Sequence, residues 1–268
     1  MSAQTRSEIA GLLSRHGLTP TRHLGQHFLA DANITRKIVA LAQLDRNSKV
    51  VEIGAGTGTL TRALAATGAR VISYEIDHGL RPVLEEVTAG FDVDLRFDDV
   101  TRVEFGSELE GEGWAMVANL PYNVGTPVVL ESIRSAHNID LFVVMMQREV
   151  ALRFAAQRGD ADYGLPSVVA GIYTDVSVAF TVPPQVFLPP PRVESAVVVM
   201  RRREAPERAE RAVELARAGF GQRRKMLRGS LARVLDDPTG TLENAGIDPT
   251  SRAEDLTPTD YLRLAMVR

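Results

Sequence analysis

The feature that most constrains this fold is a glycine-rich turn between a buried strand and a helix. The segment Val50–Ile53 is apolar apart from Glu52, and it leads into Gly54-Ala55-Gly56-Thr57-Gly58, directly before a helical pattern. Glycines at such a turn let a ligand approach the backbone and the N-terminus of the following helix. The sequence therefore predicts a ligand site at Gly54 and Gly56.

The spacing of these glycines argues against a dinucleotide. The dinucleotide-binding pattern Gly-x-Gly-x-x-Gly would require glycine at position 59, where this chain has Thr59. The next strand ends at Glu75, which follows Gly54 by about the 20 residues typical of a carboxylate that binds ribose hydroxyls. We therefore expect a ribose-bearing cofactor without a pyrophosphate, and an NAD-dependent oxidoreductase is the disfavoured alternative.

Hydrophobic patterning predicts an α/β fold. Short buried strands alternate with mostly helical stretches, which indicates a doubly wound, mostly parallel sheet. The predicted strands are Val50–Ile53, Val71–Tyr74, Val93–Phe97, Ala115–Ala118 and Leu141–Met146. Two further strands, Val176–Val182 and Ala196–Arg201, have no helix between them, so we expect them to form an antiparallel hairpin at the sheet edge.

Composition excludes several classes of protein. With 268 residues, 44% apolar and 24% charged, the chain has the composition of an ordinary soluble protein of about two domains. The absence of cysteine excludes disulfides, thiol catalysis and cysteine-ligated metals. Prolines interrupt the longest uncharged run, Val176–Pro191, and the first residues lack a secretory pattern. We expect a cytoplasmic protein with no membrane span.

One segment is strongly basic although the chain as a whole has a net charge of −3. Residues 201–234 contain eleven Arg or Lys and four Glu, and the pattern is helical and basic from about Glu207 through Leu235. Such a segment indicates a polyanionic partner, with a solvated helix as the alternative. We predict two domains, residues 1–203 with the α/β sheet and residues 204–268 with helices.

The fourth predicted strand ends in Asn119-Leu120-Pro121-Tyr122. Asn119 brings an amide acceptor, Pro121 fixes an extended turn that exposes the Leu120 carbonyl, and Tyr122 brings an aromatic face. Doubly wound sheets bind ligands at the carboxyl ends of their strands. The motif therefore predicts a site for a planar amine such as a nucleobase.

Asp98 and Asp99 follow the third predicted strand. Either carboxylate could accept a hydrogen bond from the exocyclic amine of an adenine. A helix cap is the alternative role for such a pair.

Asn119-Leu120-Pro121-Tyr122-Asn123, after the glycine turn, resembles a motif of the S-adenosylmethionine-dependent ribosomal RNA adenine dimethyltransferases, specifically the KsgA type that modifies the small subunit. Further matches run in family order from about residue 20 to 260. They are Leu24-Gly25-Gln26-His27-Phe28-Leu29, Met146–Ala151, Phe187–Val193 with Ser195–Val198, and Gln222-Arg223-Arg224-Lys225.

This resemblance implies a class I methyltransferase (Rossmann-like) sheet with a small all-helical C-terminal domain, and S-adenosylmethionine as cofactor. The implied cofactor contacts are His27, Leu29, Gly54, Glu75 at the ribose, Asp99 at the adenine and Asn119 beside the methyl group. His27 stands where bacterial members usually carry Asn. The C-terminal domain would bind RNA, and the implied contacts are Arg223, Arg224, Lys225 and Arg228.

The implied reaction is dimethylation of N6 on two adjacent adenosines in the 3′-terminal hairpin of 16S ribosomal RNA, within 30S assembly particles. Because a paired base hides its reactive atom, the adenine must flip out of its helix. We expect Tyr122 and Phe187 to sandwich it, while the Asn119 side-chain oxygen and the Leu120 carbonyl accept from its amine. We expect the enzyme to act as a monomer.

Two alternatives stay open at this point. One is a macrolide-resistance type of 23S ribosomal RNA adenine N6-methyltransferase, and the other is a ribosome-assembly factor that is mainly non-catalytic. The Phe187–Pro191 and Gln222–Lys225 segments favour the small-subunit enzyme, and the complete Asn119–Tyr122 motif favours retained activity.

Overall fold

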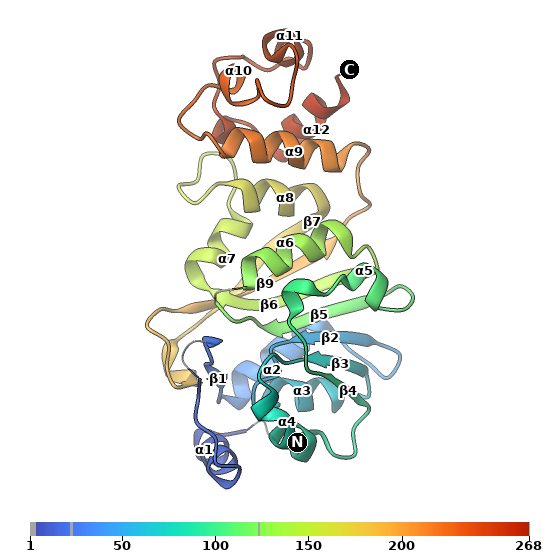
Figure 1. The fold of residues 1–268 in the computed structure, drawn as a ribbon, viewed down its shortest axis with the longest axis vertical. Helices are drawn as coiled ribbons and strands as arrows, with labels where there is room; N and C mark the ends of the chain where they lie inside the picture. The colour runs from blue at the N-terminus through green and yellow to red at the C-terminus, as the bar shows by residue number, and fades with distance from the viewer. Residues whose placement is uncertain (1–3, 22–23, 123, 268) are drawn as a thin grey trace. The chain divides into compact units, whose positions relative to one another are not determined.

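The computed structural model describes residues 4–21, 24–122 and 124–267, which form the predicted α/β fold (Figure 1). A seven-stranded mixed sheet has the order β4-β3-β2-β5-β6-β9-β7, and a second sheet pairs β1 with β8. The strands are β1 (Phe28–Leu29), β2 (Lys49–Ile53), β3 (Arg70–Tyr74), β4 (Val93–Arg96), β5 (Trp114–Asn119), β6 (Ile139–Gln147), β7 (Thr174–Val182), β8 (Phe187–Leu188) and β9 (Ser195–Arg202).

The helices that follow these strands differ widely in length. The α-helices are α1 (Arg6–Arg15), α2 (Ala32–Ala42), α3 (Thr59–Ala65), α4 (Arg81–Thr88), α5 (Phe105–Glu108), α6 (Gly125–Ser135), α7 (Arg148–Ala155), α8 (Leu165–Tyr173), α9 (Ala209–Phe220), α10 (Leu227–Ser230), α11 (Pro238–Asn244) and α12 (Pro258–Met266). Short 3-10 helices are η2 (His78–Leu80), η3 (Val100–Arg102), η4 (Pro184–Val186) and η5 (Ala253–Asp255). Among the described residues, no helix has the length and apolar character needed to cross a bilayer.

The order of the main sheet creates a switch point between β2 and β5. From β2 the chain adds the parallel strands β3 and β4 on one side, and β5 and β6 extend the sheet on the other. Strand β9 is antiparallel to β6, and β7 lies beyond β9 at the edge, in the place predicted for the hairpin. Ligands of doubly wound sheets bind outside the carboxyl ends of the strands at such a switch point.

Helices cover both faces of this sheet, which is why its central strands are almost entirely apolar. On one face, Ile38 of α2 and Leu64 of α3 pack with Val50, Val71 and Val117 in a buried cluster. Figure 1 shows α5 and α6 in front of the opposite face. Asp31 caps the N-terminus of α2, because its side chain accepts from two N–H groups of the first turn.

The chain divides into two compact units. The first contains the residues up to Ala151 and Ser177–Arg201, and the second contains Leu152–Val176 and Arg202–Arg268. The predicted boundary after residue 203 assigned residues 152–176 to the sheet domain, whereas here they belong to the second unit. The reason is that α8 packs against α9 and α12.

The predicted continuous basic helix through Leu235 is wrong. Helix α9 ends at Phe220, residues 221–225 form turns, and a new short helix, α10, begins at Leu227. The break lets Leu227 become fully buried and donate its N–H to Ser251 O at 2.7 Å. Burial of this apolar side chain therefore overrides the helical pattern.

The central strand β2 buries an ionisable group. The Glu52 side chain is 1% exposed, and Ser73 Oγ donates to its carboxyl at 2.6 Å. Burial raises the pKa of Glu52 to about 7 because it disfavours the charged form. The folded protein therefore holds this proton more tightly than the unfolded chain.

We expect Glu52 to make stability fall as the pH rises from about 4.5 to 7, because the folded state must give up a proton that the unfolded chain has already lost. Glu52→Gln should remove this dependence and gain about 2 kcal/mol over the wild type between pH 5 and pH 8. Urea unfolding at several pH values in this range measures the free energy of unfolding, and Glu112→Gln, at an exposed position, is the control. If the free energy of unfolding changes with pH in the same way for the wild type and Glu52→Gln, Glu52 does not cause the pH dependence.

Candidate functional site

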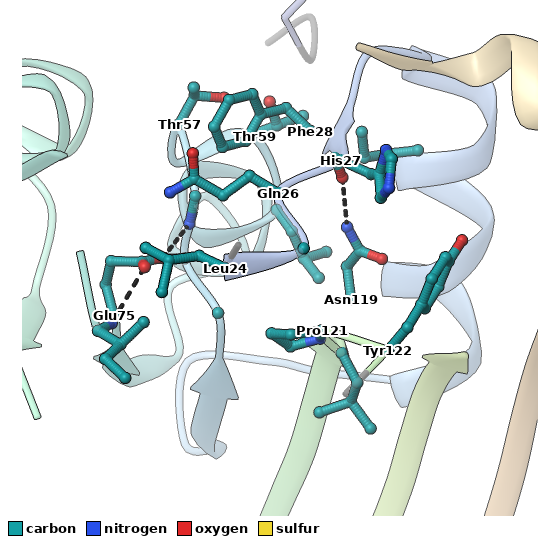
Figure 2. Close-up of a pocket in the computed structure, with 18 residues that line it drawn as sticks. Leu24, Gln26, His27, Phe28, Thr57, Thr59, Glu75, Asn119, Pro121 and Tyr122 are labelled. Carbon is teal, nitrogen blue, oxygen red and sulfur yellow. Dashed lines mark hydrogen bonds between the residues drawn. The ribbon is translucent and has the colours of Figure 1, made fainter. Parts of the chain in front are cut away.

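A pocket lies at the carboxyl ends of β2 and β5, where the strand order reverses (Figure 2). The pocket is lined by four segments that lie far apart in the sequence. They begin at Leu24, Gly54, Glu75 and Asn119. Six of the seven predicted cofactor contacts are among its lining residues: His27, Leu29, Gly54, Gly56, Glu75 and Asn119.

The glycine turn forms one wall of this pocket. Gly54, Gly56 and Gly58 have φ values of 79°, 56° and 78°, in the left-handed region that favours glycine. A Cβ atom on Gly54 would lie 3.3 Å from Pro121 Cδ and 3.4 Å from Asn119 O. Glycine therefore allows the turn after β2 and the motif after β5 to approach each other.

Glu75 is fixed at the pocket wall by backbone donors. Its Oε2 accepts from the Gly56 N–H at 2.8 Å (Figure 2). Its Oε1 accepts from the N–H groups of Ile76 and Asp77, each at 3.0 Å. Burial raises the pKa of this carboxyl, and the three N–H donors counteract that effect. Since Oε2 uses one acceptor position for Gly56, the carboxylate can also accept from a hydroxyl in the pocket.

Asn119 ends β5 with its amide held in one orientation. Its Nδ2 donates to the backbone carbonyl of His27 at 3.2 Å, and Figure 2 shows the amide oxygen pointing toward Tyr122 instead. The next N–H, of Leu120, donates to Met145 O at 3.0 Å and fixes the start of the turn. The hydrogen bond to His27 thus leaves Asn119 Oδ1 as an acceptor. Asn123, which completes the matched motif, lies outside the described residues.

Tyr122 and His27 also line a second hollow, formed with Gln147 and the segment Pro189–Val193. Their ring centroids are 5.7 Å apart, with planes tilted by 30°. The Tyr122 hydroxyl is hydrogen-bonded to Ser195 Oγ at 2.8 Å, and His27 Nδ1 lies 2.8 Å from Pro189 O. The two rings therefore form a wall shared by the pocket and this hollow.

Phe187 does not face either cavity. Its side chain is 1% exposed and belongs to the core cluster that contains Leu29 and Ile38. Its backbone in β8 pairs with Leu29 of β1. In this structure Phe187 anchors β8 to the core. The stacking of its ring on the target base stays a prediction.

Asp99 is absent from the residues that line the pocket. It caps η3, where its Oδ1 accepts from the N–H of Thr101 at 3.0 Å and from its hydroxyl at 2.7 Å. These bonds lower the pKa of Asp99. The contact between Asp99 and an adenine stays a prediction.

The four predicted RNA contacts lie in the second unit and are exposed. Arg223 pairs with Glu254 at 2.6 Å and donates to Tyr163 O at 3.4 Å. Arg224 and Lys225 have no such side-chain partner among the described residues. Hydrogen bonds from Thr250 lower the pKa of Asp248, and the charge of Arg228 adds a smaller effect in the same direction. The basic residues are therefore not equivalent, because one is tied to its own unit.

Polar residues outside the predicted site also support the pocket. Gln26 lines it, donates to Asp77 Oδ2 at 2.7 Å and accepts from the Thr21 N–H at 2.7 Å. The motif Leu24–Leu29 contains Gln26, so a signal for this residue was present. Gln4, which binds Thr57, lies in no recognised motif. No group of three or more His, Asp or Glu among the described residues could hold a metal ion.

Comparison with known proteins decides the family. The model of the ribosomal RNA adenine dimethylase family matches residues 18–267. The chain belongs to this family. It is 42% identical to ribosomal RNA small subunit methyltransferase A of Phenylobacterium zucineum, over 99% of this chain and 94% of that protein. The protein of the same name from Staphylococcus haemolyticus is 38% identical, over 97% and 94%.

Solved structures show the same fold. The 23S rRNA methyltransferase ErmE has a TM-score of 0.67 at 27% identity, over 89% of this chain and 98% of that one. A dimethyladenosine transferase from Plasmodium falciparum has a TM-score of 0.75 at 23% identity, over 89% and 96%. The predicted methyltransferase fold, enzyme class and cofactor, S-adenosylmethionine, are confirmed.

Truncation of Phe187 tests whether its ring serves the core. Phe187→Ala should lower the free energy of unfolding by about 3–5 kcal/mol, because it removes a fully buried aromatic side chain. Denaturant unfolding measures the decrease, and Phe180→Ala, at a partly buried position against the same cluster, should be less destabilising. A Phe187→Ala variant that is as stable as the wild type but slow in methyl transfer would show that the ring acts on the target base and not in the core.

Proposed function

We propose that this enzyme dimethylates N6 of two adjacent adenosines in the 3′-terminal hairpin of 16S ribosomal RNA and takes part in small-subunit biogenesis. One observation carries the proposal: the amide of Asn119 is oriented by His27 where the cofactor pocket meets the hollow lined by Tyr122. The likeness to small subunit methyltransferase A over nearly the whole chain supports the choice of RNA.

The residues present fit S-adenosylmethionine. The remaining acceptor capacity of the Glu75 carboxylate suits the ribose hydroxyls, and the glycine turn leaves the backbone accessible beside them. When bound, the cofactor supplies an electrophilic methyl group on a sulfonium sulfur. Asn119, at the end of the pocket nearest Tyr122, would border that methyl group, and Asp99 would bind the adenine.

The chemical task of this chain is to hold the amine of a flipped adenine. The lone pair on adenine N6 is delocalised into the ring, which makes this atom a poor nucleophile. Asn119 Oδ1 and the Leu120 carbonyl would accept from the amine and favour a localised lone pair, while Tyr122 lies against the base. Fixed placement of the amine in line with the methyl group then supplies much of the rate.

The second unit would bind the phosphate backbone. Arg224, Lys225 and Arg228 are exposed, and cations of this kind position RNA without reading its bases. We propose that residues 204–268 bring the enzyme, as a monomer in the cytoplasm, to 30S assembly particles. A large-subunit target is the second candidate because ErmE, a 23S rRNA methyltransferase, is structurally similar. This candidate is second because the chain is 27% identical to ErmE and 42% identical to the small subunit methyltransferase A of Phenylobacterium zucineum.

The role of the oriented amide is tested by Asn119→Ala. We expect the single-turnover rate of methyl transfer to fall by about 100-fold or more, because the variant no longer offers a preorganised acceptor to the reacting amine. Affinity for the RNA substrate should stay nearly unchanged, since one base contact contributes little beside the phosphates. Asn33→Ala, at an exposed asparagine of α2, is the control. A near-normal rate in Asn119→Ala would remove the amide from the reaction.

A salt titration of RNA binding tests the basic turn, which carries Arg224 and Lys225. The Arg224→Ala, Lys225→Ala double variant should reduce the slope of log affinity against log salt by about 0.7–0.9 for each phosphate that it no longer neutralises. Arg223→Ala should change the slope less, because Glu254 already neutralises Arg223. Filter binding to small-subunit particles at several salt concentrations measures both. Equal slopes for the wild type and the double variant would show that this turn does not bind the RNA backbone.

A further inference from the structure

The first described residues form a contact with the glycine turn that no motif of the sequence predicts. The Gln4 side chain donates from Nε2 to Thr57 O at 3.0 Å, and its Oε1 accepts from the hydroxyls of Thr57 at 3.0 Å and Thr59 at 2.8 Å. All three residues are buried, with exposures of 6%, 2% and 5%. Removal of the carboxamide would therefore leave buried polar groups without a partner.

These bonds act on the wall of the cofactor pocket. Thr57 and Thr59 line the pocket, and Thr57 lies between two glycines with positive φ. Glycine gives the unfolded turn many conformations, so ordering the turn for a ligand has a high entropic cost. Gln4 holds this turn in the shape that presents Gly56 to Glu75.

Arg6, two residues later, binds the segment on the other side of the site. Its Nη2 donates to the backbone carbonyls of Gln185 and Phe187, the latter at 2.7 Å. Phe187 lies in β8, which pairs with β1 and continues into Pro189. Pro189 lines the hollow and lies against the His27 ring. Arg6 thus holds the strand that leads into the wall of the proposed base site.

Helix α1 begins directly after Thr5, the residue between Gln4 and Arg6. A capping box closes its first turn, in which Thr5 N donates to Glu8 Oε2 at 2.6 Å and Glu8 N donates to Thr5 Oγ1 at 3.3 Å. Its buried side chains Ile9 and Leu13 pack in a cluster with Phe28 and Leu84. The helix is therefore anchored to the first unit independently of Gln4 and Arg6.

We infer that Gln4 and Arg6, which flank the N-cap of α1, are positioning residues that join the cofactor turn to the β8 strand. Gln4 sets the affinity for S-adenosylmethionine, and Arg6 sets the alignment of the target base against the bound cofactor. This inference rests on the proposed function of the pocket. Neither side chain needs to touch the reacting atoms.

Separate variants test the two assignments in the full-length protein. Gln4→Ala should weaken binding of S-adenosylmethionine, measured by calorimetry without RNA, by about tenfold or more, as removal of buried hydrogen bonds implies. Arg6→Ala should leave this affinity within about twofold and lower the single-turnover rate at saturating cofactor and RNA. Arg6→Lys, which keeps a cationic donor, should recover part of that rate.

Thr5→Ala is the matched control, because it breaks the capping box of the same helix and leaves the hydrogen bonds of Gln4 and Arg6 in place. It should lower thermal stability while cofactor affinity and the transfer rate stay at wild-type values. If Gln4→Ala and Arg6→Ala behave like Thr5→Ala, the segment has only a structural role and the inference is overturned. Tight cofactor binding by the wild type with no transfer to ribosomal RNA would instead contradict the proposed function, and the calorimetric comparison would still decide the role of Gln4.

Discussion

The close approach of Gly54 to the Asn119–Pro121 backbone is the constraint on which this site depends. A Cβ atom on Gly54 would meet Pro121 and the Asn119 carbonyl at 3.3 and 3.4 Å, in a backbone conformation that other residues avoid. Glycine therefore favours this approach, because another residue at position 54 would need a strained φ and a shift of the neighbouring atoms. Since these strands are neighbours at the switch point of the sheet, the fold places a cofactor wall beside a base-binding motif.

The remaining walls come from segments that are distant along the chain. Strand β1 places Leu29, and the preceding residue His27, next to the pocket, and its pairing with β8 places Pro189 beside the His27 ring. Backbone carbonyls accept several of the hydrogen bonds that hold these segments. The His27 carbonyl orients Asn119, and the Gln185 and Phe187 carbonyls bind Arg6. The Asn119 amide, which we propose binds the target amine, is thus oriented by the main chain.

Local patterns predict the parts of the structure that local physics decides. The apolar runs locate the central strands, and the Gly54-to-Glu75 spacing locates the carboxylate at the pocket. The direction of the Phe187 ring and the end of α9 are decided instead by burial against residues far away in the sequence. The contact of Gln4 with Thr57 spans more than fifty positions, and periodicity has no means of detecting it.

The central claim is that this pocket transfers methyl groups to adenines of the small ribosomal subunit. The most direct measurement is nucleoside mass spectrometry on ribosomal RNA from unmodified small-subunit and large-subunit particles, each incubated with the wild-type protein and S-adenosylmethionine. We predict N6,N6-dimethyladenosine in small-subunit RNA, at close to two residues per molecule of 16S RNA, and none in large-subunit RNA. Methylation of large-subunit RNA alone, or of a base other than adenine, would contradict it.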